Sequence, residues 1–180
     1  MLKYSLRDIL ADPRLVIHMD ETMDLQSLSL GPDQYPLVRS PHVQGKIQNL
    51  DGKVLRVTGE VETMIHMPCS RCMEDVEVPL QIGFEQRFIQ ENPDRTDPED
   101  EDLEVFQGFT LDLEEFVINE MRLGIPMKPL CREDCKGLCP HCGHNLNEGP
   151  CGCDPHEEDP RWDALKRMLQ ANHKQDGQEV

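Results

Sequence analysis

Residues 43–72, VQGKIQNLDGKVLRVTGEVETMIHMPCSRC, decide the fold. Apolar or small residues alternate with polar ones over residues 43–47, and Asp51 and Gly52 then supply the residue pair that a tight hairpin turn prefers. Beyond the turn, apolar residues fall at odd positions: Leu55, Val57, Val61, Ile65 and Met67. A period of two over this length predicts strands that bury one face.

A third strand is predicted after the turn PCSRC at residues 68–72. Apolar residues here fall at even positions: Val76, Val78, Leu80, Ile82, Phe84 and Phe88. Three consecutive strands joined by short turns predict an antiparallel β-meander or barrel-like sheet. A helix is predicted from residue 113, because four apolar residues share one face: Leu113, Phe116, Val117 and Met121. Gly124 and Pro126 end this helix. The predicted sheet and helices together indicate an α+β fold class.

All eight cysteines occur as close pairs along the chain. In Cys139-Pro140-His141-Cys142, the two-residue spacing lets both sulfurs point at one centre, as a tetrahedral zinc site requires. We therefore predict two zinc ions, held by Cys69, Cys72, Cys131, Cys135, Cys139, Cys142, Cys151 and Cys153. An iron–sulfur cluster, a redox dithiol and structural disulfides are the alternatives. Four-sulfur sites leave no open coordination position, and we find no catalytic set of residues, so the chain is not expected to be an enzyme.

Four pairs combine into two four-cysteine sites in three ways. The pair Cys139/Cys142 lies eight residues from Cys151/Cys153, and closing so short a loop costs little entropy. The other site then joins Cys69/Cys72 to Cys131/Cys135 and links the second hairpin turn to the segment after the predicted helix. The main rival joins Cys131/Cys135 to Cys139/Cys142. Three histidines near the pairs are expected to stay outside the ligand sets: His66, His141 and His144.

Residues 91–104, ENPDRTDPEDEDLE, contain eight acidic residues and one basic residue. This composition is typical of a solvated loop, with an acidic docking arm as the alternative. We expect residues 1–126 to form an α+β body that contains this loop. Residues 127–180 are expected to form a cysteine-rich zinc module and a helix that starts at Asp159-Pro160, packed on the body as one unit. In the first forty residues, Ser5 and Asp8 have the spacing of a helix capping box, and Pro13 limits any helix there to a short one.

The 180 residues include 35 acidic and 18 basic side chains, which give a formal net charge of −17. Eight thiolates around two divalent cations would make this net charge more negative by four, because eight negative charges are offset by only four positive ones. This balance disfavours electrostatic coating of nucleic acid or of an anionic membrane, since such binding needs many lysine and arginine contacts to phosphate. A specific contact with RNA is still compatible with it. No apolar run reaches the ~20 residues of a membrane span, and no export signal is found, so the chain is expected to be cytoplasmic.

Four basic residues lie in or beside the cysteine pairs: Arg71, Lys128, Arg132 and Lys136. They compensate the charge of two tetrathiolate zinc centres, each formally −2, or they form a small basic patch that contacts RNA phosphate or another partner. The sequence leaves both interpretations open.

Three motifs carry a family resemblance: CSRC at residues 69–72, GIPMKPLC at 124–131 and CKGLCPHCG at 135–143. Together with Asn145-Leu146-Asn147, they resemble the YceD-like family, whose bacterial and plastid members are described as large ribosomal RNA subunit accumulation proteins. The resemblance spans roughly residues 40–170. It implies a role in the maturation or accumulation of large-subunit (23S) ribosomal RNA, and it supplies no established catalytic residues.

The resemblance and the cysteine pattern together predict a non-enzymatic, zinc-binding factor of ribosome biogenesis. We expect it to bind precursor large-subunit ribosomal RNA, a large-subunit ribosomal protein, or both, with no membrane partner and no small-molecule substrate. One alternative is a zinc-stabilised protein-interaction or chaperone-like adaptor that does not act on RNA. Another is a thiol redox switch that releases zinc on oxidation.

Overall fold

The computed structural model describes residues 2–91, 103–153, 162 and 167. The chain divides into two compact units, residues 1–135 and residues 136–180. The helix expected from Asp159-Pro160 and most of the acidic segment 91–104 lie outside the described residues. The expectation that the body and the cysteine module pack as one unit stays a prediction. None of the helices in the described residues has the length and apolar character needed to span a membrane.

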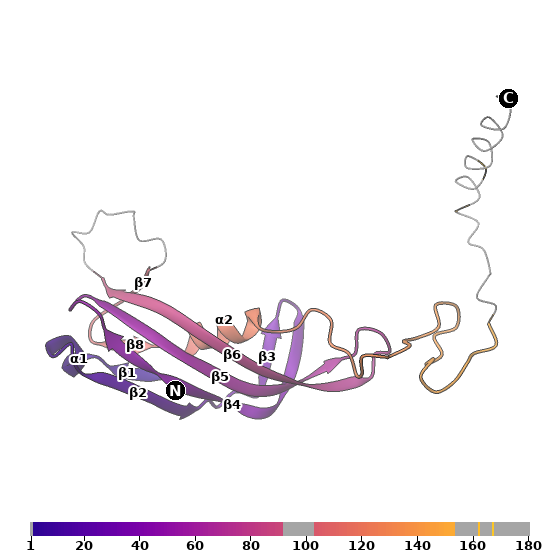
Figure 1. Ribbon diagram of the computed structural model, residues 1–180, viewed down its shortest axis with the longest axis horizontal. Coiled ribbons are helices and arrows are strands. Elements are labelled where there is room, and N and C mark those ends of the chain that lie inside the picture. The colour runs from indigo at the N-terminus through magenta and orange to yellow at the C-terminus, as the bar shows by residue number, and fades with distance from the viewer. Residues whose placement is uncertain (1, 92–102, 154–161, 163–166, 168–180) are drawn as a thin grey trace, which may run out of the picture. The chain divides into compact units, whose positions relative to one another are not determined.

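The centre of the first unit is the predicted meander of β4 (Asp33–Asn49), β5 (Val54–Pro68) and β6 (Asp75–Gln90) (Figure 1). Strand β5 pairs antiparallel with both neighbours. Its odd positions face the core, and four of them are fully buried: Leu55, Val57, Val61 and Ile65. In β6, three even positions are buried: Leu80, Phe84 and Phe88. The predicted meander and its buried face are therefore confirmed.

Two shorter strands extend the meander, one on each side. β2 (Val16–Thr22) pairs antiparallel with β4, and β7 (Leu103–Phe106) pairs parallel with β6, which gives the order β2-β4-β5-β6-β7. A sixth strand, β3 (Ser27–Leu30), also pairs with β4. No pairing within the described residues joins β2 to β7, so the sheet is open and the expectation of a barrel-like sheet is wrong. These edge strands pair with only part of the long strands beside them, whereas a barrel needs continuous ladders around its circumference.

Side-chain acceptors organise the first hairpin turn. Asp51 Oδ1 accepts two backbone N–H groups from the residues that follow it, at 3.0 and 2.8 Å, and Gly52 adopts a φ of 82°. The buried Asn49 accepts the Gly52 N–H with Oδ1 and donates from Nδ2 to the Ile9 carbonyl at 2.9 Å. Asn49 therefore ties the turn to α1 (Arg7–Ala11), which confirms the short helix expected before Pro13. The capping box expected there is wrong, because the N-cap residue is Leu6 and no side chain caps the helix.

Helix α2 (Glu114–Leu123) lies against part of the sheet (Figure 1). The Phe116 ring packs edge-on against Phe84 and Phe88, with centroids 5.6 and 5.8 Å apart. Val117 and Met121 of the same helix are buried. The predicted helix is confirmed, and its end directs the chain toward the third and fourth cysteines.

The first residues of the chain contribute to the same core. β1 (Lys3–Ser5) pairs with β8 (Thr110–Asp112), more than a hundred residues away in sequence. Leu2, Leu6 and Ile9 are buried.

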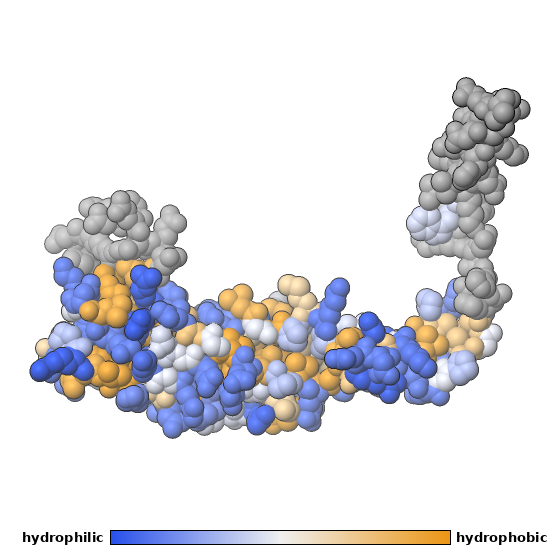
Figure 2. All heavy atoms as spheres, in the orientation of Figure 1, coloured by the Kyte–Doolittle hydropathy of each residue, from blue (hydrophilic) through white to orange (hydrophobic). Residues whose placement is uncertain are grey.

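The surface seen in Figure 2 is largely hydrophilic, with hydrophobic residues in separate groups.

Candidate metal centres

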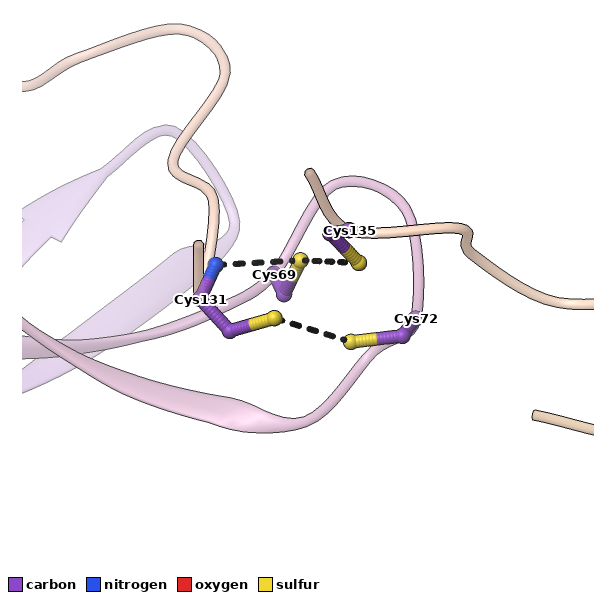
Figure 3. A group of neighbouring side chains, drawn as sticks. All are labelled: Cys69, Cys72, Cys131 and Cys135. Atoms are coloured by element: carbon purple, nitrogen blue, oxygen red, sulfur yellow. Dashed lines mark hydrogen bonds between the residues drawn. The ribbon is translucent and has the colours of Figure 1, made fainter. Parts of the chain in front are cut away.

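The first cysteine cluster joins the turn between β5 and β6 to the segment that follows α2 (Figure 3). Cys69 and Cys72 lie in the turn, whereas Cys131 and Cys135 lie in the later segment. The four side chains point toward one another, and all four sulfurs lie within 4.8 Å of one another. Three of the four residues are buried. Residues about sixty positions apart in sequence thus meet at one centre.

The spacing of these sulfurs fits a single metal ion. Cys69 Sγ lies 3.9 Å from Cys135 Sγ, and Cys72 Sγ lies 3.6 Å from Cys131 Sγ. A tetrahedral ion with metal–sulfur bonds of about 2.3 Å holds its sulfurs about 3.8 Å apart, whereas a disulfide needs about 2.05 Å. A polynuclear iron–sulfur cluster would spread the cysteine sulfurs further, because several iron ions lie between them. The cluster could therefore hold one four-coordinate ion, with no open position.

Backbone hydrogen bonds close the turn that carries Cys69 and Cys72. The Cys69 N–H donates to the Glu74 carbonyl at 2.8 Å, and the Met73 N–H donates to the Cys69 carbonyl at 3.0 Å. Met73 has a φ of 64° and is the only non-glycine residue with positive φ in the described part of the chain. A left-handed residue at this position closes the turn.

Backbone donors oppose burial in setting the charge of this cluster. Burial raises the pKa of Cys69, but the N–H groups of Arg71, Cys72 and Cys131 donate to its sulfur and together lower the pKa to about 6. At Cys72, the Glu74 N–H lowers the pKa, but burial and hydrogen bonds with the neighbouring thiols outweigh it and raise the pKa to about 12. Four thiols this close cannot all ionise without a counter-charge, which a divalent cation would supply.

Three more hydrogen bonds hold the hairpin turn against the later cysteine segment. The Ser70 N–H donates to the Pro129 carbonyl at 2.8 Å. The Arg71 guanidinium donates to the Cys135 carbonyl at 2.8 Å and to the Glu133 carbonyl at 3.4 Å. Arg71 therefore positions the backbone that carries the fourth sulfur.

The second unit brings the other four cysteines together. The sulfurs of Cys139, Cys142, Cys151 and Cys153 lie within 4.8 Å of one another. Cys139 is buried, Cys142 is exposed, and the other two are half-buried. The structure thus groups the eight sulfurs into the two sets that short loop closure favours, and not into the rival sets.

The second cluster repeats the turn of the first. The Gly143 N–H donates to the Cys139 carbonyl at 2.9 Å, and Gly143 has a φ of 74°. Gly143 thus corresponds to Met73. The N–H groups of Cys142 and His141, aided by a neighbouring thiol, lower the pKa of Cys139 to about 6. In both clusters, therefore, backbone N–H groups lower the pKa of the first cysteine of a Cys-x-x-Cys turn.

Two asparagines support the loop around the second cluster, a role that sequence reasoning missed. Asn147 Oδ1 accepts the Lys136 N–H at 2.8 Å, and Asn145 Oδ1 accepts the Asn147 N–H at 3.0 Å. Leu138 and Asn145 form an isolated antiparallel bridge. The Asn-x-Asn spacing was the available signal, because asparagine side chains commonly accept nearby backbone N–H groups.

The four basic residues near the cysteines have different surroundings. Arg71 donates to backbone carbonyls, as described above. Arg132 Nε lies 3.5 Å from Asp134 Oδ1 in an exposed ion pair. Lys128 and Lys136 are exposed, the first in one unit and the second in the other. Two of the four are therefore held by the chain's own acceptors, and both histidines of the second unit's loop, His141 and His144, are exposed outside the cluster.

Fold and site define a class of protein that combines a β-meander with two four-cysteine clusters able to hold metal. The first cluster joins a turn of the meander to the segment after α2. The chain belongs to the YceD family. The family model described as "Large ribosomal RNA subunit accumulation protein YceD" matches residues 57–169, a range that contains both clusters.

Relatives of this chain occur in bacteria and in a plant. An uncharacterized protein of Mycobacterium tuberculosis is 37% identical over 134 residues, which cover 70% of this chain and 64% of that protein. The uncharacterized protein YlbN of Bacillus subtilis is 27% identical over 169 residues, 93% of this chain and 96% of that protein. The large ribosomal RNA subunit accumulation protein YCED homolog 1, chloroplastic, of Arabidopsis thaliana is 28% identical over 152 residues, 69% of this chain and 47% of that protein. The chain thus spans less than two thirds of the mycobacterial relative, and no solved structure matches it.

Proposed function

We propose that this protein is a non-enzymatic factor that promotes the accumulation or processing of large-subunit (23S) ribosomal RNA. The family match over residues 57–169 carries the proposal, because the family is named for this role. The plant relative bears the same name. The protein acts in the cytoplasm by binding precursor ribosomal RNA, a large-subunit ribosomal protein, or both.

The proposal assigns one zinc ion to each cysteine cluster. Zinc suits four thiolates in a tetrahedral arrangement and has no redox chemistry of its own. Cys69, Cys72, Cys131 and Cys135 would hold the first ion, and the residues of the second unit's cluster would hold the other. When bound, zinc supplies a fixed cross-link, and the chain's own hydrogen bonds, such as that of Arg71, orient the turns around it.

The charge of the chain favours a protein partner or a mixed contact. The net charge of −17 repels phosphate over most of the surface. An acidic body suits a basic ribosomal protein, whereas contact with RNA would be confined to the few basic residues near the clusters, among them Lys128. This division of contacts is part of the proposal.

The decisive experiment measures ribosomal RNA in a strain that lacks the gene. We expect 23S ribosomal RNA and its precursors to change relative to small-subunit RNA, and the wild-type gene to restore them. A Cys69→Ser/Cys131→Ser variant should fail to restore them, whereas Ser70→Ala, a change between two cysteines that leaves every sulfur in place, should succeed. Unchanged ribosomal RNA in the deletion strain would favour an adaptor that does not act on RNA.

A second measurement separates a structural role of zinc from a redox switch. Purified, reduced protein should contain two zinc ions and keep both under mild peroxide. Loss of zinc with reversible formation of disulfides under these conditions would instead support the redox switch.

A further inference from the structure

A pocket opens in the first unit where two strands of the meander diverge. The ladder between β4 and β5 ends at the pair Leu37–Ile65. Beyond this pair, residues 33–36 are paired with β3 and residues 66–68 are paired with β6. The space between the two strands is a pocket of about 520 Å³.

The walls of this pocket carry negative charge. Asp33 lines it from β4, and Asp75 lines it from β6. Both carboxylates are exposed, and neither forms an ion pair or a side-chain hydrogen bond within the described residues. Glu77 lies opposite His66 in the adjacent ladder, and the pocket lining contains no lysine or arginine. The pocket therefore attracts a cation and repels phosphate.

The remaining walls favour a long side chain over a small ion. Tyr35, Pro36 and Pro68 line the pocket beside the carboxylates. Proline rings and an aromatic face accommodate the methylene groups of lysine or arginine, and an aromatic ring attracts their charged end groups. A bare metal ion fits less well, because among the described residues only the two cysteine clusters bring three or more ligand groups within reach of one ion.

We propose that the pocket between residues 33–36 and 66–68 binds an arginine or lysine side chain of a basic protein. Asp33 and Asp75 pair with the charged end group, and Tyr35 with the two prolines packs against the stem. The pocket lies at the end of β5 that leads to Cys69, so a partner bound here would contact the chain beside its first cluster. The inference rests on the proposed function in one respect, which is that a basic ribosomal protein is the partner.

The test uses the full chain with metal bound and three blocked pentapeptides, acetyl-GGXGG-amide with X as arginine, lysine or citrulline. We expect the arginine and lysine peptides to shift the backbone resonances of residues 33–36, 66–68 and 75, whereas citrulline, which is neutral, should not. An Asp33→Asn/Asp75→Asn variant should raise the Kd at least tenfold. Glu60→Gln/Glu85→Gln, two exposed acids elsewhere on β5 and β6, should leave it unchanged.

Three outcomes would overturn the inference. Equal loss in both double variants would show only general attraction to an acidic protein, and shifts confined to other residues would place the site elsewhere. Spermine tests whether the pocket binds a free polyamine instead of a protein side chain. Pocket shifts with spermine but with neither charged peptide would exclude a protein side chain as the ligand.

Peptide binding and the deletion strain together separate this inference from the proposed function. If the peptides fail to bind but the deletion strain loses 23S ribosomal RNA, the pocket assignment is wrong and the proposed function stands. If the peptides bind as expected but ribosomal RNA is normal in the deletion strain, the pocket stands and the proposed function is wrong.

Discussion

Met73 and Gly143 occupy equivalent positions, four residues after the first cysteine of their turns. Their φ values are 64° and 74°, and each donates its N–H to that cysteine's carbonyl. Glycine adopts this left-handed conformation at little cost, whereas a residue with a Cβ pays about 1–2 kcal/mol. The Met73 side chain is exposed, so its burial offsets little of this conformational free energy.

Met73→Gly should therefore stabilise the metal-bound protein. We expect the free energy of unfolding to rise by about 1 kcal/mol, because relief of the backbone cost exceeds the entropy that glycine adds to the unfolded chain. Chemical denaturation monitored by circular dichroism measures the change. Met127→Gly is the control: Met127 is almost fully exposed and lacks positive φ, so the same substitution should give no gain. A gain in both variants would contradict the argument.

Arg71 is a positioning residue of the first cluster. Its guanidinium donates to the carbonyls of Cys135 and Glu133, so Arg71→Ala should leave these acceptors without their partner. We expect a loss of about 1–2 kcal/mol in stability and faster transfer of metal to a chelating dye. Arg132→Ala removes a similar charge from an exposed ion pair and should change stability by less than about 0.5 kcal/mol. Equal effects of the two substitutions would show that charge alone matters.

At the scale of elements, a pair of glycines allows β4 and β5 to lie close together, and one of them, Gly59, leaves room for Phe84. Gly45 and Gly59 are paired in the β4–β5 ladder. A Cβ on Gly59 would lie 2.8 Å from Phe84 Cζ and 2.4 Å from the Gln44 carbonyl oxygen. The Phe84 ring in turn packs against Phe116 of α2. Absence of a side chain at Gly59 therefore leaves the space that Phe84 occupies beside Phe116.

Gly59→Ala should destabilise the sheet by about 1–3 kcal/mol, because the backbone oxygen of Gln44 cannot move aside as a flexible side chain could. Thermal unfolding measures the change. The matched control is Gly83→Ala in the neighbouring strand, where the nearest atom to the new Cβ would lie 3.9 Å away. Gly83→Ala should be neutral or slightly stabilising. A neutral Gly59→Ala would show that the strands separate more easily than their pairing indicates.

On the scale of the whole molecule, the two clusters differ in what surrounds them. The sheet has its own apolar core, separate from the small group of buried residues around Cys69, Cys72 and Cys135. In residues 136–153, by contrast, Cys139 is the only buried apolar residue. Binding energy at a structural metal site is folding energy, and its share is largest where there is little core.

Removal of metal by a chelator under reducing conditions should therefore act unequally. We expect residues 136–153 to lose all protection from amide hydrogen exchange, and residues 69–74 and 129–135 to lose part of it. The centres of β4, β5 and β6 should stay protected, because their core contains no cysteine. Hydrogen exchange with mass spectrometry resolves these segments. Cooperative loss of the whole sheet would falsify the view that the first cluster only fastens one end of it.

Sequence periodicity was sufficient to predict the elements whose buried face is set by local spacing. Alternation along residues 55–67 and 76–88 identified the meander, and four apolar residues on one helical face identified α2. The elements before residue 31 are only three to seven residues long, and β1 pairs with residues near position 111. So short a pattern carries no reliable period, and its partner is not nearby in the chain.

By itself, then, the amino-acid sequence determined the three strands of the meander, helix α2, the cysteine pairs and the family resemblance, because all of these depend on residue types at short, fixed spacings. Tertiary structure alone decided that the sheet stays open, that Arg71 binds carbonyls and that β4 diverges from β5 to leave a pocket. Each of these depends on where backbone segments far apart in sequence come to lie, and local propensity does not encode such distances.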